Sequence, residues 1–186
     1  MRDVLEQTDQ HLIAVAREGD DGAFEQIVRR YEPVVAATVI GMLGYCAEAE
    51  DVGQETFVRL YKSLGQYRGE ASLKTYITRI AMNLSLNELK RRKRRRERIS
   101  GTPVEEFHNL EAKGEGAERR DTRETVQKAI GQLDDKFRPV IVLRLIDGYS
   151  TDETARILDI PVGTVLSRLA RAQEKLKAVL INQERG

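Results

Sequence analysis

The strongest chemical feature of the sequence is a run of basic side chains. Eight of the nine residues from Lys90 to Arg98 are Lys or Arg, and they give this segment a net charge of +7. Residues 1–89 carry −5, and the whole chain carries only +1. Charge this concentrated binds phosphate groups, so it favours a nucleic-acid partner, and the acidic block suggests a second partner of different character. A nuclear-localisation-like tract, an RNA or membrane patch and a solvated helix end are the alternatives.

Few other residues are arranged for catalysis. Glu48, Asp51 and Glu55 have helical i, i+3 and i+4 spacing and could share a metal ion, but no His accompanies them. The single Cys46 excludes an internal disulfide, packs more often than it senses redox state, and forms no zinc pattern with the two His. No Gly-rich phosphate loop is present. We expect no enzyme activity, metal or cofactor; a metal-dependent nucleic-acid-processing enzyme built on residues 48–55 is a minor alternative.

Composition and periodicity predict an all-α protein with two small helical domains joined by a flexible linker. Leu, Ala, Arg, Glu, Lys and Gln dominate, which suits helices. Residues 98–120 contain Gly, Pro and Glu without periodicity, so they form the expected linker between domains at residues 1–97 and 121–186. We see no signal-peptide pattern and no apolar run of about 20 residues, so we expect a cytoplasmic protein.

Four features define the helices expected in the N-terminal domain. Asp21 is a candidate cap, and a helix is expected to begin near Pro33. Another helix is expected over residues 46–64, with a buried side formed by Ala49, Val52, Phe57, Leu60 and Tyr61. Ser72 is a good cap for a long helix that runs to about Arg96 and would be roughly 36 Å long.

This long helix has a polar face that leads into the basic run. Apolar residues recur at helical spacing and predict its buried stripe: Leu73, Ile77, Ile80 and Leu84. Two amides and two cations follow one another at i, i+4, i+7 and i+11 on another face: Asn83, Asn87, Lys90 and Arg94. The basic run is therefore expected to continue one helix whose upstream turns expose amides.

The C-terminal domain contains a helix-turn-helix pattern. A helix is expected over residues 139–146. Ser150 and Glu153 form a capping box, and the small Ala155 is expected to face a neighbouring helix. A tight connection at residues 159–162 leads to a second helix from about Gly163. A second helix of this kind enters the major groove of DNA.

Helical angles divide that second helix into two faces. The expected buried arc comprises Val165, Leu169, Ala172 and Leu176, and Leu166 borders it. The opposite face carries small polar and basic side chains that can meet bases and phosphates: Thr164, Ser167, Arg171 and Lys175, with Arg168 at its margin. An ordinary helical hairpin with a solvated basic face is the alternative interpretation.

The turn and second helix resemble the promoter-reading domain of bacterial sigma factors of the extracytoplasmic-function (ECF) group, in the sigma-70 family. The resemblance lies in residues 161–165, PVGTV, and 167–169, SRL. LuxR-type regulators share a similar helix-turn-helix, so the N-terminal half must decide between the two classes.

Two N-terminal segments resemble the same group. Residues 49–57, AEDVGQETF, are similar to its core-polymerase-binding helix, which implies that one face docks on a coiled coil of the largest polymerase subunit: Asp51, Gln54, Glu55 and Val58. A solvated acidic helix face is the alternative. Residues 72–84 are similar to the strand-opening segment, and the resemblance implies contacts with the −10 promoter element from Tyr76, Asn83, Asn87, Lys90, Arg91 and Arg94.

The resemblance implies a transcription initiation factor that binds core RNA polymerase, including its flap, and promoter DNA. The −35 element would be recognised by Thr164, Ser167, Arg168, Arg171 and Lys175, and an anti-sigma factor would control the protein. Four residues depart from the family pattern: Tyr76 replaces the usual Trp, Gly53 lies inside the polymerase-binding helix, Asp159 replaces a common Gly, and Leu166 replaces a common basic residue. The alternative is a stand-alone helix-turn-helix regulator that binds operator DNA as a dimer.

Overall fold

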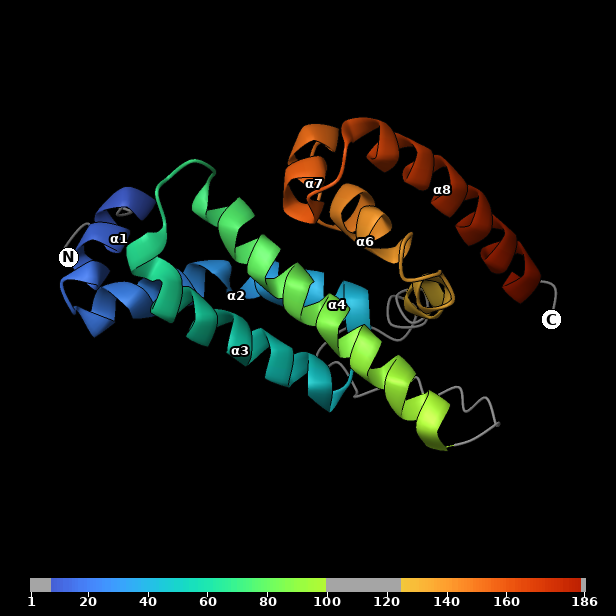
Figure 1. Ribbon diagram of the computed structural model, residues 1–186, viewed down its shortest axis with the longest axis horizontal. Helices are drawn as coiled ribbons and strands as arrows, with labels where there is room; N and C mark the ends of the chain where they lie inside the picture. Colours follow the sequence, from blue (N-terminus) through green and yellow to red (C-terminus); the bar gives the residue numbers. More distant parts are fainter. Residues whose placement is uncertain (1–7, 100–124, 185–186) are drawn as a thin grey trace.

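The structure is a computed structural model that describes residues 8–99 and 125–184, and within these ranges it contains helices and no strand (Figure 1). This confirms the predicted all-α class. Residues 98 and 99 still belong to a helix, and the rest of the expected linker lies outside the described residues. The N-terminal elements are α1 (Asp9–Arg17), α2 (Asp21–Leu43), α3 (Ala47–Ser63), the 3-10 turn η1 (Leu64–Gln66) and α4 (Leu73–Ile99). The C-terminal elements are a helix over residues 125–131, α6 (Arg138–Ile141), the π-helical turn η2 (Val142–Ile146), α7 (Thr151–Leu158) and α8 (Val162–Glu184).

Local polar contacts fix where the N-terminal helices begin. Asp20 caps α2, because its Oδ1 accepts a hydrogen bond of 2.9 Å from the Ala23 N–H; the expectation that Asp21 is the cap was wrong by one residue. Pro33 lies in the interior of α2 and not near a helix start. Its side chain is exposed, and buried residues before and after it hold the helix together across the missing N–H. Ser72 is the cap of α4, accepting a hydrogen bond of 3.1 Å from the Thr75 N–H.

Helix α4 is the central element of the fold. It packs against α2, α3 and α7, and Figure 1 shows the C-terminal helices gathered on one side of it. The predicted stripe is buried at Leu73, Ile77 and Leu84 and half-buried at Ile80. Further buried positions lie on other sides of the helix, which α2, α3 and α7 cover between them: Thr75, Thr78, Ala81, Met82 and Ser85.

The helix-turn-helix forms as its local signals predicted. Ser150 and Glu153 make both hydrogen bonds of the capping box at the start of α7. Asp159 ends α7 in the left-handed conformation, with φ 54° and ψ 50°, which Asp tolerates better than most residues. Ala155 is buried in a small cluster with Val140 and Val165. The helix expected over residues 139–146 is instead α6 followed by the π-helical turn.

The two domains are in direct contact. The Thr38 hydroxyl in α2 donates to Asp147 Oδ2 at 2.8 Å, and the hydroxyls of Thr78 in α4 and Tyr149 are 2.7 Å apart. Gly41 allows α2 to approach the π-helical turn closely, since a Cβ built at this position would lie 2.9 Å from a methyl of Val142. This contact joins the buried residues of both domains into one cluster.

Asp147 is an ionisable group within this domain contact. Its burial raises the pKa to about 6, although the hydrogen bond from Thr38 and the positive charge of Lys74 both favour the ionised form. The other carboxylate oxygen, Oδ1, is buried and has no hydrogen-bond partner among the described residues. An ionised Asp147 therefore opposes the contact between the domains near neutral pH.

Substituting two helical glycines should have opposite effects on stability. Gly41→Ala would force a methyl against Val142 and should lower the free energy of unfolding by about 1–3 kcal/mol, partly offset by the better helix propensity of Ala. Gly53→Ala should raise it by roughly 1 kcal/mol, because no heavy atom lies within 4 Å of the added carbon. Urea denaturation followed by circular dichroism measures both. Equal effects of the two substitutions would contradict the close approach at Gly41.

Replacing Asp147 by Asn should stabilise the protein in a pH-dependent way. The folded-state pKa of about 6 lies above that of an unfolded Asp, so the unfavourable effect of the ionised group is complete above pH 6 and disappears as the pH falls towards 4. Asp147→Asn should therefore gain about 1–3 kcal/mol at pH 7.5 and much less at pH 4.5. The exposed Asp135→Asn is the control. A gain that does not change with pH would rule out this account.

Candidate functional site

The exposed side of α4 is a narrow polar stripe. Between Leu73 and Leu89 most of the helix is covered by its neighbours, and the side chains left exposed recur three or four residues apart. The four predicted residues Asn83, Asn87, Lys90 and Arg94 are all exposed, and Arg79 extends the stripe by one turn towards the start of the helix. Sequence reasoning missed Arg79, although it lies four residues before Asn83 and the same spacing could have found it.

The stripe adjoins, at Asn83, a groove of about 420 Å³ between α3, η1 and α4. Tyr76 and Asn83 line it from α4, and the facing side is formed by residues that sequence reasoning missed: Arg59, Lys62, Ser63 and Gln66. Tyr76 is half-buried, with its ring centroid 5.1 Å from that of Tyr67, whose hydroxyl donates to the Ala71 carbonyl at 2.6 Å. An aromatic ring, amides and cations around one groove can hold an unstacked nucleobase and its phosphates.

The basic run is divided between the interior and the surface. Arg92 turns inward, where its guanidinium donates to the Leu43 carbonyl at 3.2 Å and lies 2.8 Å from Cys46 Sγ and 3.4 Å from Glu48. Its contacts join the end of α2, the start of α3 and α4. Lys93, Arg94, Arg95 and Arg98 are exposed, and Arg91 is exposed while paired with Glu88 at 2.8 Å.

The predicted polymerase-binding face of α3 points away from the core. Asp51, Gln54 and Val58 are exposed, and Glu55 is half-exposed and paired with Arg59 at 2.9 Å. The opposite side is buried at Ala49, Val52, Thr56 and Leu60. Tyr61, expected on the buried side, is 51% exposed and forms a T-shaped ring pair with Phe24 of α2, with the ring centroids 4.9 Å apart.

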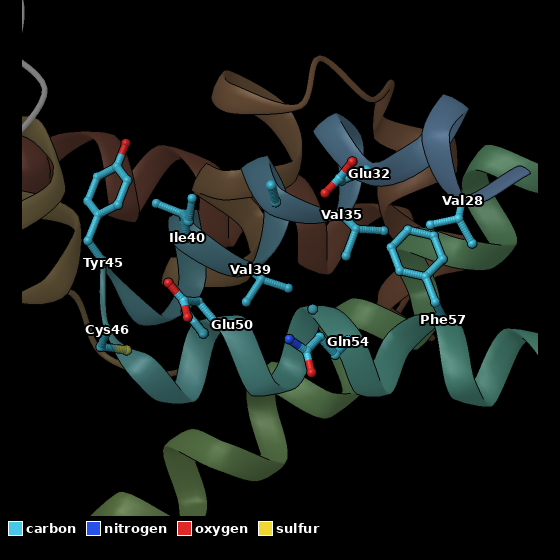
Figure 2. Close-up of a pocket in the computed structure, with 13 residues that line it drawn as sticks. Val28, Glu32, Val35, Val39, Ile40, Tyr45, Cys46, Glu50, Gln54 and Phe57 are labelled. Atoms are coloured by element: carbon cyan, nitrogen blue, oxygen red, sulfur yellow. The ribbon is translucent and has the colours of Figure 1, made fainter. Parts of the chain in front are cut away.

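An apolar groove of about 540 Å³ lies between α2 and α3, beside this face (Figure 2). Its lining is mainly aliphatic and aromatic: Val28, Val35, Val39, Ile40 and Phe57. The exposed residues Glu32, Glu50 and Gln54 add acidic and amide groups. The combination of an apolar floor with acidic groups suits a partner helix that is apolar on one side and basic beside it.

The three carboxylates considered as metal ligands have separate surroundings. Glu48 lies beside Arg92, and hydrogen bonding to its own backbone N–H, together with that positive charge, lowers its pKa. Glu55 pairs with Arg59, and Asp51 is exposed. In residues 8–99 and 125–184, no three His, Cys, Asp or Glu side chains lie close enough together to hold a metal ion.

The predicted faces of α8 are partly correct. Val165 and Ala172 are buried and Leu169 and Leu176 are half-buried, as expected, whereas Leu166 is 54% exposed and does not border the core. Among the predicted DNA contacts, Ser167 and Arg171 are exposed, and Thr164 and Arg168 are half-buried. Lys175 is exposed, but its ammonium group forms an ion pair of 2.6 Å with Asp134 and lies over the ring of Phe137.

Comparisons with known proteins agree with this geometry. The family model for sigma-70 region 2 matches residues 27–95, and that for sigma-70 region 4 matches residues 123–176. The ECF RNA polymerase sigma-E factor of Salmonella typhimurium is 35% identical over 178 residues, which cover 91% of this chain and 92% of that protein.

Two solved structures are similar over most of the chain. The structure of CnrH in complex with the cytosolic domain of CnrY has 30% identity and a TM-score of 0.69, covering 94% of this chain and 97% of that one. The sigma factor RpoE in complex with the anti-sigma factor NepR, from Bartonella quintana, has 24% identity and a TM-score of 0.70, covering 84% of this chain and 96% of that one. The second likeness concerns the fold alone. In the part of the chain that the structure describes, no helix has the length and apolar character to span a bilayer.

Two arginines from the basic run should respond differently to truncation. Arg94→Ala removes an exposed cation, so it should leave stability within about 0.5 kcal/mol and reduce the salt dependence of single-stranded DNA binding by about 0.7 in the log–log slope. Arg92→Ala removes the guanidinium that donates to the Leu43 carbonyl and lies beside Glu48, so it should cost about 1–3 kcal/mol of stability and leave the slope nearly unchanged. Urea denaturation and fluorescence anisotropy at several salt concentrations measure these effects; a lower slope for Arg92→Ala would contradict its structural role.

Proposed function

We propose separate roles for the two domains of this chain, which belongs to the ECF group of the sigma-70 family and directs core RNA polymerase to promoters. The N-terminal domain, residues 1–97, binds the core enzyme and recognises and melts the −10 element. The C-terminal domain, residues 121–186, recognises the −35 element, and residues 98–120 connect the two domains. The protein works in the cytoplasm, where the polymerase is, and itself catalyses no reaction.

The exposed stripe of α4 is the observation that carries this proposal. It joins a groove containing an aromatic ring and an amide, at Tyr76 and Asn83, to the exposed cations Lys90, Arg91 and Arg94. In melted DNA an unstacked base lies next to a charged backbone, so a groove for the base followed by cations for the phosphates matches that order. Asn87 lies between the two parts and meets the strand as it leaves the groove.

Helix α3 and the groove beside it form the proposed polymerase interface. Asp51, Gln54, Glu55 and Val58 present carboxylates, an amide and an apolar side chain to a coiled coil of the largest polymerase subunit. The neighbouring α2–α3 groove, with its apolar floor and acidic groups, enlarges this surface. The acidic character of residues 1–89 favours basic side chains on the partner.

An anti-sigma factor is the proposed regulator. CnrH, which is 30% identical to this chain, forms a complex with the cytosolic domain of CnrY, and this supports a protein partner for the present chain. RpoE, which shares the fold, is bound to the anti-sigma factor NepR, a partner of the kind proposed here. A regulator that occupies the α2–α3 groove would compete directly with the polymerase, because Gln54 belongs both to the groove and to the polymerase-binding face.

The polymerase interface can be tested with a matched pair of double variants. Gln54→Ala with Glu55→Ala should reduce capture of core RNA polymerase at least tenfold and abolish promoter-dependent run-off transcription. Glu25→Ala with Gln26→Ala is the control: the residue types are the same, they are exposed on α2, and Glu25 pairs with Arg29 as Glu55 pairs with Arg59. Circular dichroism must show that both variants are folded.

Either of two results would overturn the proposal. Equal loss of polymerase binding in both variants would show that acidic surface in general, and not the α3 face, is responsible. Failure of the unaltered protein to bind core polymerase, together with a dimer that binds duplex DNA alone, would favour the stand-alone regulator.

A further inference from the structure

The exposed face of α8 is centred differently from the predicted one. Successive residues of a helix are about 100° apart around its axis, so the buried Val165 and Ala172 define the side of α8 that faces the core. The midline of the opposite, exposed side then runs through Gly163, Ser167 and Ala170. Arg171 lies on one flank of this midline. Leu166 lies on the other flank, so it belongs to the face that a DNA groove would meet.

Leu166 is the most exposed large apolar side chain among the described residues, at 54%. Val162, one turn earlier on the same side of α8, is 41% exposed. Ile160 and Pro161 of the turn adjoin Val162, and the polar and basic side chains of Ser167 and Arg171 lie on the same exposed side of α8 as Leu166. Such a small convex patch beside Ser167 and Arg171 is suited to a groove of DNA, because a stable protein interface needs a much larger surface.

The major groove offers one apolar group to such a side chain. Thymine presents its C5 methyl there, whereas the edges of the other bases carry hydrogen-bond donors and acceptors. A leucine placed against one of those polar edges would remove water without replacing its hydrogen bonds, which is unfavourable. A leucine on this face of α8 would therefore favour thymine over the other bases, and Arg171 is placed to supply an accompanying phosphate or guanine contact.

We propose that Leu166 is a specificity-determining residue that packs against the C5 methyl of one thymine in the upstream promoter element, with Val162 beside it; this rests on the assignment of α8 to that element. Position 166 then selects a base by apolar contact, where a basic side chain would select by charge and hydrogen bonding. The upstream sequence preferred by this protein accordingly contains a thymine whose methyl group, and not only its base pairing, contributes to affinity.

Replacing thymine by deoxyuridine tests the proposal, because it removes only the methyl group. The preferred upstream sequence is first selected from promoters with a randomised −35 region, using core RNA polymerase loaded with the full-length chain. Each thymine of the selected sequence is then replaced in turn. One replacement should weaken promoter binding by the unaltered protein about fourfold, the ratio expected for one methyl-sized apolar contact. Leu166→Ala should bind more weakly and no longer distinguish thymine from deoxyuridine at that position.

Two further variants sharpen the test. Leu166→Arg should shift the selected base from thymine to guanine at the same position, because Arg pairs with the O6 and N7 atoms of guanine. Leu145→Ala is the matched control, since Leu145 is 53% exposed but lies outside α8, in the π-helical turn. It should leave both the selected sequence and the deoxyuridine effect unchanged.

Several outcomes would overturn the proposal. A selected element without thymine, no effect of deoxyuridine, or the same effect in Leu166→Ala would each exclude a methyl contact by Leu166. A loss of core polymerase binding in Leu166→Ala, with promoter selection unchanged, would instead make the patch a protein contact. The double variant Ser167→Ala with Arg171→Ala distinguishes a wrong role for Leu166 from a wrong role for the whole helix. If that double variant also leaves upstream selection unchanged, the assignment of α8 to the upstream element is itself wrong.

Discussion

Helix α4 is packed on several sides, and this packing positions the polar stripe. This one helix contacts α2 and α3 of its own domain and α7 of the other, so most of its circumference over residues 73–89 is covered. Only a narrow stripe remains for function, and its side chains have a fixed order along a straight axis. The same helix then leaves the core, and its later turns expose cations. A binding surface on a helix that packs against several neighbours is positioned more precisely than a binding surface on a loop.

The contact between the two domains combines good packing with an ionisable group. Gly41 permits the approach of α2 to the π-helical turn, and Tyr149 completes a hydrogen bond to Thr78 of α4. Asp147 works against this contact at neutral pH, because its carboxylate is buried with one oxygen unpaired among the described residues. The domains are therefore held by close packing and by hydrogen bonds, including one of 3.0 Å from the buried Arg138 guanidinium to the Met42 carbonyl of α2. The ionised Asp147 limits how tightly they associate.

The features that were predicted correctly are those that depend on residues close together in the chain. The capping box at Ser150 and the left-handed Asp159 need only a few adjacent residues, and the polar stripe of α4 needs only helical periodicity. Features decided by distant contacts were missed. Arg92 turns inward because Leu43 and Cys46 meet it at the α2–α3 connection, 49 and 46 residues away in the chain. The groove at Tyr76 combines residues of two helices, and the exposure of Leu166 depends on where α6 and α7 cover α8.

The two candidate DNA surfaces differ in shape as well as in expected sequence preference. Around Tyr76 the surface is a concave groove of about 420 Å³ with amide and cationic walls, which suits a base removed from its stack. The exposed side of α8 is convex, with a small apolar flank and a basic one, which suits the major groove of intact duplex. In the proposed function, these two surfaces would distinguish paired from melted DNA by shape. Arg92 turns inward, whereas other cations of the run are exposed on the surface beyond the groove: Lys90, Arg91, Lys93, Arg94, Arg95 and Arg98.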